Sequence, residues 1–442
     1  MSEVWVGIQD YADSAPKWLD ASVSFSWLRA LEASSSSIEC IAFVREINYT
    51  RDMVTPIRGV SYRFRKAQFP NWAAEIPAIA PALILYNLCE YNIGAGAMQF
   101  LHYNLPNTTH VIRLHHEVKF LMAHEGFREC VLEADIAIVP TESQVDDLRE
   151  IGFHGEIRVI PFGVDRRIME RSRRPWGGRD IDFVCANTAA PQKNAVLLQK
   201  VFTILISKGY RTENAGGLTP SGLAEKLGRS KIFFQPSMTE ASGSRVLLEG
   251  IAAGCYPIAL TESKTTSEVA LQHGGQSIES GISFDFSTRK VFNPSGIEEV
   301  LAERLVSALV SLKSDERSDL SLLPEYDEAH EIGCLVRIMR DHKGKKNWRD
   351  RPLVRAAASM LESIGESAKE LTAEGVVASA KRVSKIERNQ TEVAKAATAI
   401  CTSVGFSAGI PGLASKIFTE RFDFISEVSW LISEARSAAA RK

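Results

Sequence analysis

The sequence has little of what would place it at once among nucleic-acid-binding, metal-binding or secreted proteins. Its 52 lysines and arginines face 54 aspartates and glutamates, for a formal net charge of -2, so no nucleic acid is expected as a partner. The seven cysteines are scattered, odd in number and never spaced Cys-x-x-Cys. This pattern predicts neither a zinc site nor a disulfide framework, and it favours a reducing, cytoplasmic location.

Long apolar segments are also missing. Two stretches without Asp, Glu, Lys or Arg are long enough to consider as membrane spans, residues 91–112 and 396–415. The first contains several polar residues and the second contains Pro411 and glycines, which makes both poor spanning segments. A buried helical hairpin is the simpler interpretation of the second. The N-terminus has no basic region followed by an apolar core, so no signal peptide is predicted.

What the chain does contain is an alternation of short apolar runs and amphipathic segments. Its 442 residues, 45% hydrophobic and 24% charged, are typical of a soluble protein with two or three domains. In residues 1–165 we predict strands at 4–8, 40–45, 60–65, 82–88, 109–114, 136–139 and 157–160. Helices are predicted between them at 24–32, 95–101, 118–133 and 142–151. This order predicts an α/β domain with a doubly wound parallel sheet.

A second α/β domain is predicted over residues 178–325, after an Arg-rich stretch at 166–179 that is a candidate linker. Its strands are expected at 181–185, 231–235 and 256–260, and its helices at 195–207, 221–227, 245–253 and 298–312. From residue 352 the chain becomes Ala-rich, and its apolar residues follow helical spacing. Residues 352–442 are therefore predicted to form a helical tail that packs on itself or on a second subunit of a homo-oligomer.

The clearest chemical pattern lies between residues 234 and 259. A buried strand ends at Pro236-Ser237, a polar loop carries Glu240, and Ser242-Gly243-Ser244 opens a helix that contains Glu249. Anions bind where parallel strands end and helices begin, and a small turn lets a diphosphate approach the backbone. Carboxylates beside that anion would repel it unless they accepted hydrogen bonds from hydroxyl groups. The pattern therefore indicates a nucleotide sugar as ligand.

This segment resembles the retaining GT-B glycosyltransferases of the "group 1", or family 4-like, family. Upstream, Ala134-Asp-Ile-Ala-Ile-Val-Pro-Thr-Glu-Ser and Ile157-Arg-Val-Ile-Pro-Phe-Gly-Val-Asp165 look like the end of that family's N-terminal domain. Pro191-Gln-Lys193-Asn looks like its lysine loop. The resemblance implies two Rossmann-like domains and transfer of a sugar from a nucleotide-diphospho-sugar to an unidentified acceptor. It also implies retention of configuration, with no metal and no cofactor.

The resemblance further implies roles for individual residues. Glu249 would hold the ribose hydroxyls and Glu240 would contact the sugar. Lys193 would bind the diphosphate, with backbone donors from Ser242, Gly243 and Ser244. Arg245 is a possible substitute for the family's arginine, whose usual position is occupied here by Cys185-Ala-Asn187. His115 or His116 would face the donor sugar.

Three departures from the family are present, and two of them, the missing arginine and the shortened second domain, favour a second hypothesis. Eight residues separate Glu240 from Glu249 where the family usually has seven, and only about two dozen residues join helix 195–207 to strand 231–235. Roughly one βαβ unit, about 30 residues, is thus deleted or reduced. The alternative is a non-catalytic GT-B protein that binds a nucleotide sugar and acts through its helical tail.

Plain structural interpretations remain open for single residues. Glu249 and Lys193 could be solvated side chains, and the His115-His116 pair could be one core histidine and its exposed neighbour. With Glu117 and His124 these histidines match no zinc spacing. Gly94-Ala-Gly96 lacks the third glycine of a dinucleotide fingerprint, which counts against an NAD-dependent oxidoreductase. The basic run at 343–351 could bind membrane phospholipid, but a solvated linker is favoured.

Overall fold

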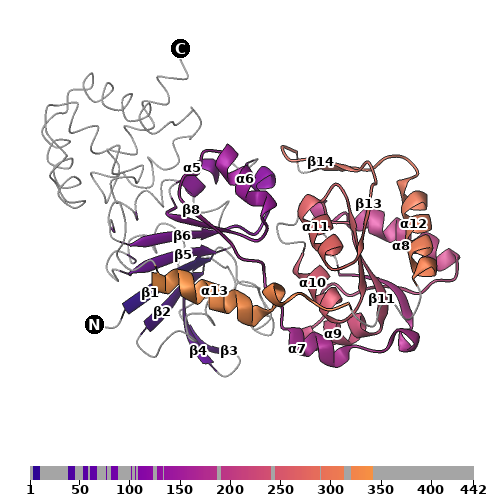
Figure 1. Ribbon diagram of the computed structural model, residues 1–442, viewed down its shortest axis with the longest axis horizontal. Helices are drawn as coiled ribbons and strands as arrows, with labels where there is room; N and C mark the ends of the chain where they lie inside the picture. The colour runs from indigo at the N-terminus through magenta and orange to yellow at the C-terminus, as the bar shows by residue number, and fades with distance from the viewer. Residues whose placement is uncertain are drawn as a thin grey trace, which may run out of the picture.

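The fold consists of two α/β domains, of which the first is interrupted in the chain by the second (Figure 1). In the computed structural model the described residues are 3–9, 38–44, 53–57, 60–66, 76, 81–87, 101, 105, 108–122, 127–132, 134–186, 191–239, 244–288, 290–312 and 320–341. The predicted helices at 24–32 and 95–101 lie outside these ranges except for Leu101, and the predicted helical tail at 352–442 lies outside them entirely. Within the described ranges, no helix is long and apolar enough to cross a membrane.

The first domain is built on an eight-stranded sheet of order β3-β4-β2-β1-β5-β6-β7-β8. The strands are β1 Glu3–Gln9, β2 Ile38–Val44, β3 Met53–Ile57, β4 Val60–Lys66, β5 Leu83–Asn87, β6 Thr109–Arg113, β7 Ile136–Val139 and β8 Glu156–Val159. Every pairing is parallel except that of β3 with β4. All residues of β6 and β7 are buried, as expected for central strands covered on both faces. The predicted doubly wound sheet is confirmed, and β3 is an addition to it.

Three described helices lie between β6 and β8 in the chain: α4 Val118–Leu121, α5 Phe127–Leu132 and α6 Ser143–Glu150. α6 confirms the helix predicted at 142–151. The prediction of one continuous helix over 118–133 is wrong, because α4 ends at Leu121 and Met122 is already in a turn; α5 spans Phe127–Leu132.

The second domain has a five-stranded parallel sheet of order β10-β9-β11-β12-β13. Its strands are β9 Ile181–Cys185, β10 Thr212–Asn214, β11 Ser230–Gln235, β12 Tyr256–Leu260 and β13 Gln276–Ile278. Its helices are α7 Arg166–Ser172, α8 Ala195–Ser207, α9 Pro220–Gly228, α10 Arg245–Ala252, α11 Lys264–Gln272 and α12 Ile297–Ser311. A hairpin of β14 Ser283–Asp285 and β15 Lys290–Phe292 lies between β13 and α12.

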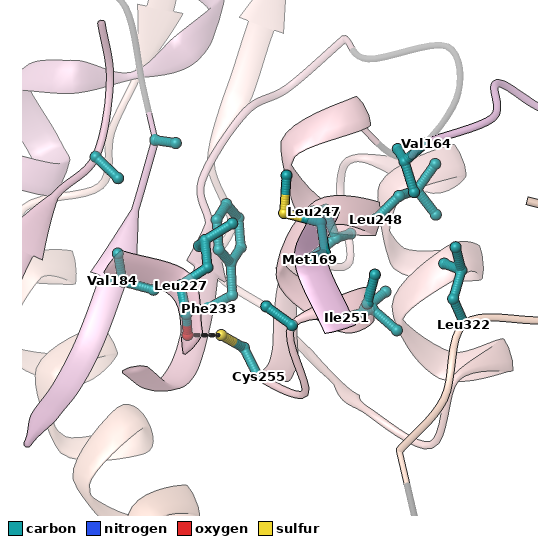
Figure 2. Packing of buried hydrophobic residues seen from close by; sticks show 14 of the residues in the cluster. Val164, Met169, Val184, Leu227, Phe233, Leu247, Leu248, Ile251, Cys255 and Leu322 are labelled. Atoms are coloured by element: carbon teal, nitrogen blue, oxygen red, sulfur yellow. Dashed lines mark hydrogen bonds between the residues drawn. The ribbon is translucent and has the colours of Figure 1, made fainter. Parts of the chain in front are cut away.

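The side chains of β11 alternate between two hydrophobic cores, one on each face of the second sheet. Ile232 and Phe234 belong to one cluster with residues of α8 and α12, whereas Phe233 belongs to the other with residues of α9, α10 and α11. Successive side chains of a strand point to opposite faces of its sheet. In the second cluster Phe233 lies beside α10, whose Leu247, Leu248 and Ile251 are fully buried (Figure 2).

The Arg-rich stretch at 166–179 is not a linker, contrary to the sequence prediction. It folds into α7 and the 3-10 turn Trp176–Gly178, and Met169 of α7 is buried in the core of the second domain (Figure 2). Asp165 caps α7 by accepting hydrogen bonds from the backbone N–H groups of Arg167 and Ile168. Met169 is the one buried residue of α7, with Ile168 partly buried against the same core, so the apolar signal of this helix in the sequence is weak.

α13 Glu328–Asp341 follows the second domain in the chain but lies with the first domain in space (Figure 1). The two chain crossings between the domains run side by side. Val164 N donates to Tyr326 O at 3.0 Å, and Glu328 N donates to Val164 O at 3.1 Å. A Cβ atom added to Gly163 would overlap the backbone of Glu328, so only glycine fits where the crossings meet.

The contact between α7 and α9 gives a test of the second core. A Cβ atom at Gly228, the last residue of α9, would overlap the carbonyl oxygen of Ser172, whereas one at the exposed Gly333 of α13 would meet nothing within 4 Å. We expect Gly228→Ala to lower the free energy of unfolding by about 2 kcal/mol through overpacking. Gly333→Ala should raise it by about 0.5–1 kcal/mol, because alanine is the better helix former. Urea unfolding of both variants measures the two values, and equal effects would contradict the described packing.

Candidate functional site

The loop after β11 gathers buried polar groups at the carboxyl end of the second sheet. Ser237 and Thr239 are fully buried, and Gln235 Nε2 donates to Ser237 Oγ at 2.9 Å. Within the described part of the chain, Thr239 Oγ1 and Gln235 Oε1 have no hydrogen-bond partner. Buried polar atoms without partners are rare in folded proteins. A ligand that reaches the end of β11 would supply the missing hydrogen bonds.

Ser244 marks the start of α10 with an unusual backbone conformation. Its φ of 67° and ψ of 121° are values that residues other than glycine seldom adopt, and the residue is buried. Such conformations cost energy and gather at functional sites. The other predicted loop residues, Glu240, Ser242 and Gly243, lie outside the described residues.

Arg245 and Glu249 come together on the first two turns of α10. Arg245 Nε lies 3.3 Å from Glu249 Oε1, and the two side chains are only 15% and 11% exposed. Burial raises the pKa of the Glu249 carboxyl, and the nearby Arg245 opposes that shift. A guanidinium at the first residue of a helix adds to the positive end of the helix dipole. The arrangement is therefore suited to an anion, while Glu249 can accept hydrogen bonds.

The turn that carries Lys193 lies beside the same loop. Met238 N donates to Gln192 O at 3.0 Å, which holds the 3-10 turn Pro191–Lys193 against the segment after β11. Asn194, with a left-handed φ of 51°, immediately precedes α8, and its side-chain amide donates to the amide oxygen of Asn293 at 3.0 Å. Lys193 is thus on a turn held at Gln192 and followed by the anchored Asn194, next to the loop that leads to Ser244 and Arg245.

The two predicted histidines follow β6 in the first domain, and their side chains pack against different aromatic rings. The ring of His115 stacks on Phe162 of the first crossing, with ring centroids 4.7 Å apart. Burial, then the charges of Arg113 and His116, lower the pKa of His115 well below its ordinary value. The imidazole is therefore neutral at neutral pH and can both donate and accept a hydrogen bond. His116 instead stacks on Phe120 of α4, at 4.9 Å.

The segment after these histidines touches the second domain directly. Thr265 Oγ1, at the start of α11, donates to Glu117 Oε1 at 3.1 Å. Phe120 lies 6.1 Å, between ring centroids, from Phe284 of the hairpin that extends from the second domain. Sequence reasoning missed Thr265 and Phe284, and weighed Glu117 only as a metal ligand. No local pattern signals a contact between positions 148 residues apart.

Across the residues that the structure describes, no group of three or more His, Cys, Asp or Glu side chains is placed to hold a metal ion. His124, the fourth member of the group considered from the sequence, lies outside them.

Comparison with known proteins rests on structure alone. No protein-family model matches the sequence, and no curated protein matches it. Among solved structures, α,α-trehalose-6-phosphate synthase from Burkholderia multivorans is similar at a TM-score of 0.53 and 12% identity, covering 77% of this chain and 97% of its own. Sucrose-phosphate synthase from Thermosynechococcus elongatus is similar at a TM-score of 0.50 and 14% identity, covering 77% of this chain and 98% of its own. A trehalose-6-phosphate structure from E. coli, bound with UDP-2-fluoro glucose, is similar at a TM-score of 0.52 and 10% identity, covering 78% of this chain and 100% of its own.

At such low identity the likeness establishes the fold. The chain has the GT-B architecture: two Rossmann-like domains with parallel sheets, joined by two adjacent crossings.

Proposed function

We propose that this protein is a glycosyltransferase that moves a sugar from a nucleotide-diphospho-sugar to an acceptor. The observation that carries the proposal is the group at the start of α10. Strained Ser244, Arg245 at the positive helix end and buried Glu249 lie at the carboxyl end of a parallel sheet. This is where doubly wound domains bind nucleotides. The GT-B fold and the bound UDP-2-fluoro glucose in one similar structure support a nucleotide sugar as the ligand.

Each residue then has a proposed role. Arg245, Lys193 and the backbone N–H groups of Ser242, Gly243 and Ser244 would bind the diphosphate, because cations and helix N-termini stabilise charge on a leaving phosphate. Glu249 would accept hydrogen bonds from the ribose hydroxyls and Glu240 from those of the sugar. His115 or His116 would face the donor sugar from the first domain and act in catalysis.

The proposed reaction breaks the bond between C1 of the sugar and the diphosphate oxygen. The bonding electrons leave with the nucleoside diphosphate, and an acceptor hydroxyl oxygen forms the new bond to C1 on the same face, which retains the configuration. The hydroxyl proton passes to the departing phosphate oxygen. The negative charge that develops on the leaving diphosphate would be stabilised by Arg245, Lys193 and the backbone N–H groups named above. We propose that neither metal nor cofactor takes part.

A second candidate is a non-catalytic nucleotide-sugar-binding protein of the same fold. The reduced second domain favours it, because the segment between α8 and β11 contains only the three-residue strand β10 and the helix α9. This alternative shares the donor site with the first proposal and differs only in turnover.

Titration calorimetry of the full chain with UDP-, GDP-, ADP- and dTDP-sugars tests the proposal, together with an assay of nucleotide release in the presence of acceptor extracts. We expect one of these donors to bind, inorganic pyrophosphate to compete with it, and nucleotide to be released. Binding without release on any acceptor would favour the non-catalytic alternative. Absence of binding to every donor would overturn both.

A further inference from the structure

A buried ion pair joins the end of β6 to α13, 218 residues away in sequence. Arg113 Nη2 donates to Glu331 Oε1, and both side chains are 1% exposed. The second carboxylate oxygen, Glu331 Oε2, accepts from the backbone N–H of Gly163 at 2.7 Å. One carboxylate therefore holds a strand end of the first domain and the first crossing between the domains.

The same guanidinium connects this pair to the predicted active-site histidine. Arg113 Cζ lies 4.4 Å from the centroid of the Phe162 ring, and Phe162 stacks on His115. Phe162 immediately precedes Gly163, whose N–H is held by Glu331. The Phe162 ring thus contacts two groups, Arg113 and His115, and the residue that follows it is held by a third, Glu331.

The chemistry of these contacts decides what would move without Glu331. The Glu331 carboxylate compensates the buried charge of Arg113, and the flat guanidinium fork stacks on a ring only in a restricted orientation. If the carboxylate were removed, Arg113 would turn toward water or backbone carbonyls, and Gly163 would lose its acceptor. Phe162 would then lose both constraints on its position, and His115 would lose the ring against which it packs.

We propose that Glu331 is a positioning residue for His115, acting through Arg113 and Phe162. α13 then does more than complete the first domain. It carries into that domain the carboxylate that fixes the histidine relative to the first crossing. The inference rests on the proposed function, in that His115 is taken to face the donor sugar and to act in the transition state rather than in binding the donor.

Three variants of the full chain test this inference. Glu331→Gln removes the charge but keeps the shape. Arg113→Lys keeps the charge but loses the planar fork that covers Phe162. The double variant Arg113→Met with Glu331→Leu replaces the pair by apolar side chains of similar volume, which is often neutral for stability. Asp180→Asn is the control, because Asp180 forms an ion pair with Arg229 in the second domain and has no role in the site.

We expect all three variants to lower kcat about 10²-fold, the loss typical of a misplaced catalytic group, while donor Kd and KM stay within about threefold of wild type. The side-chain NMR signal of His115, assigned among the nine histidines by its absence in His115→Gln, should shift in each variant and not in Asp180→Asn. Should Glu331→Gln fail to fold, the double variant and Arg113→Lys still decide the question.

A folded double variant with wild-type kcat and an unchanged His115 signal would overturn the inference. A parallel loss of donor binding and kcat with an unchanged His115 signal would also overturn it, since that is the mark of general damage. If wild type bound no nucleotide sugar, the proposed function would fail, but the His115 signal would still report whether Glu331 positions that ring.

Discussion

Replacing Glu249 by glutamine is expected to weaken binding of the nucleotide sugar about 10²-fold. The Glu249 carboxylate is buried on α10, and we propose that it accepts hydrogen bonds from the two ribose hydroxyls. Each hydrogen bond to a charged group contributes about 1.5–3 kcal/mol. Glutamine keeps one acceptor oxygen but loses the charge, so about 2.7 kcal/mol, or 10²-fold, is the expected loss.

A double-mutant-type cycle, in which Glu249 is substituted and the ribose hydroxyls are removed from the ligand, separates the role of Glu249 from that of Arg245. Glu249→Gln also leaves Arg245 without its carboxylate, which could change diphosphate binding. We therefore compare the preferred donor with its 2′,3′-dideoxy form, on wild type and variant. Loss of the hydroxyls should cost wild type about as much as the substitution does, and should cost Glu249→Gln little more.

Glu298→Gln serves as the control for this cycle, because Glu298 is a surface carboxylate of α12 paired with Lys200. It should bind both ligands as wild type does. If removal of the hydroxyls weakened binding equally in wild type and Glu249→Gln, the ribose would not be held by Glu249.

Replacing Arg179 by alanine is expected to lower the free energy of unfolding of the second domain by about 4 kcal/mol. Arg179 is buried, and its guanidinium donates to four backbone carbonyls, those of Arg174, Ser230, Ala253 and Gly254, at 2.7–3.2 Å. These carbonyls belong to the segment after α7, to β11 and to the turn after α10. Alanine would remove the guanidinium donors from these carbonyls, and three of the four lost hydrogen bonds are buried.

Urea or thermal unfolding of Arg179→Ala measures this effect, with Arg211→Ala as the control. Arg211 is an exposed arginine of the same domain that pairs with Asp180, and such surface pairs contribute about 1 kcal/mol at most. Arg179→Lys should fall between the two, because an ammonium keeps the charge but cannot reach all four carbonyls. A loss below about 1 kcal/mol in Arg179→Ala would show that water replaces the guanidinium without cost.

Much of the fold could be predicted because local patterns carry it. The strands at 136–139, 181–185 and 256–260 and the helix at 195–207 have the bounds predicted for them. Each is a buried run or a strongly amphipathic segment, in which the period of apolar residues decides the element. β10 and β13 have three residues each, too few to show a period, and α11 begins with polar and β-branched residues that favour no one structure.

For the site, the sequence placed Glu249 and Arg245 on one helix, and their spacing of four residues alone puts them side by side. It likewise brought His115 and His116 to a strand end, since β6 was recognised from its apolar residues. Glu240, Ser242 and Gly243 stay predictions.

The sequence by itself determined the two parallel sheets, the helix that carries Glu249 and the strand end that carries the histidines, because each follows from residues close together in the chain. Only the tertiary structure decided that α13 returns to the first domain, that Glu331 meets Arg113 and Gly163, and that Thr265 reaches Glu117. These contacts join residues 148 to 218 positions apart. Their energy depends on burial and mutual orientation, which appear only when both domains are assembled.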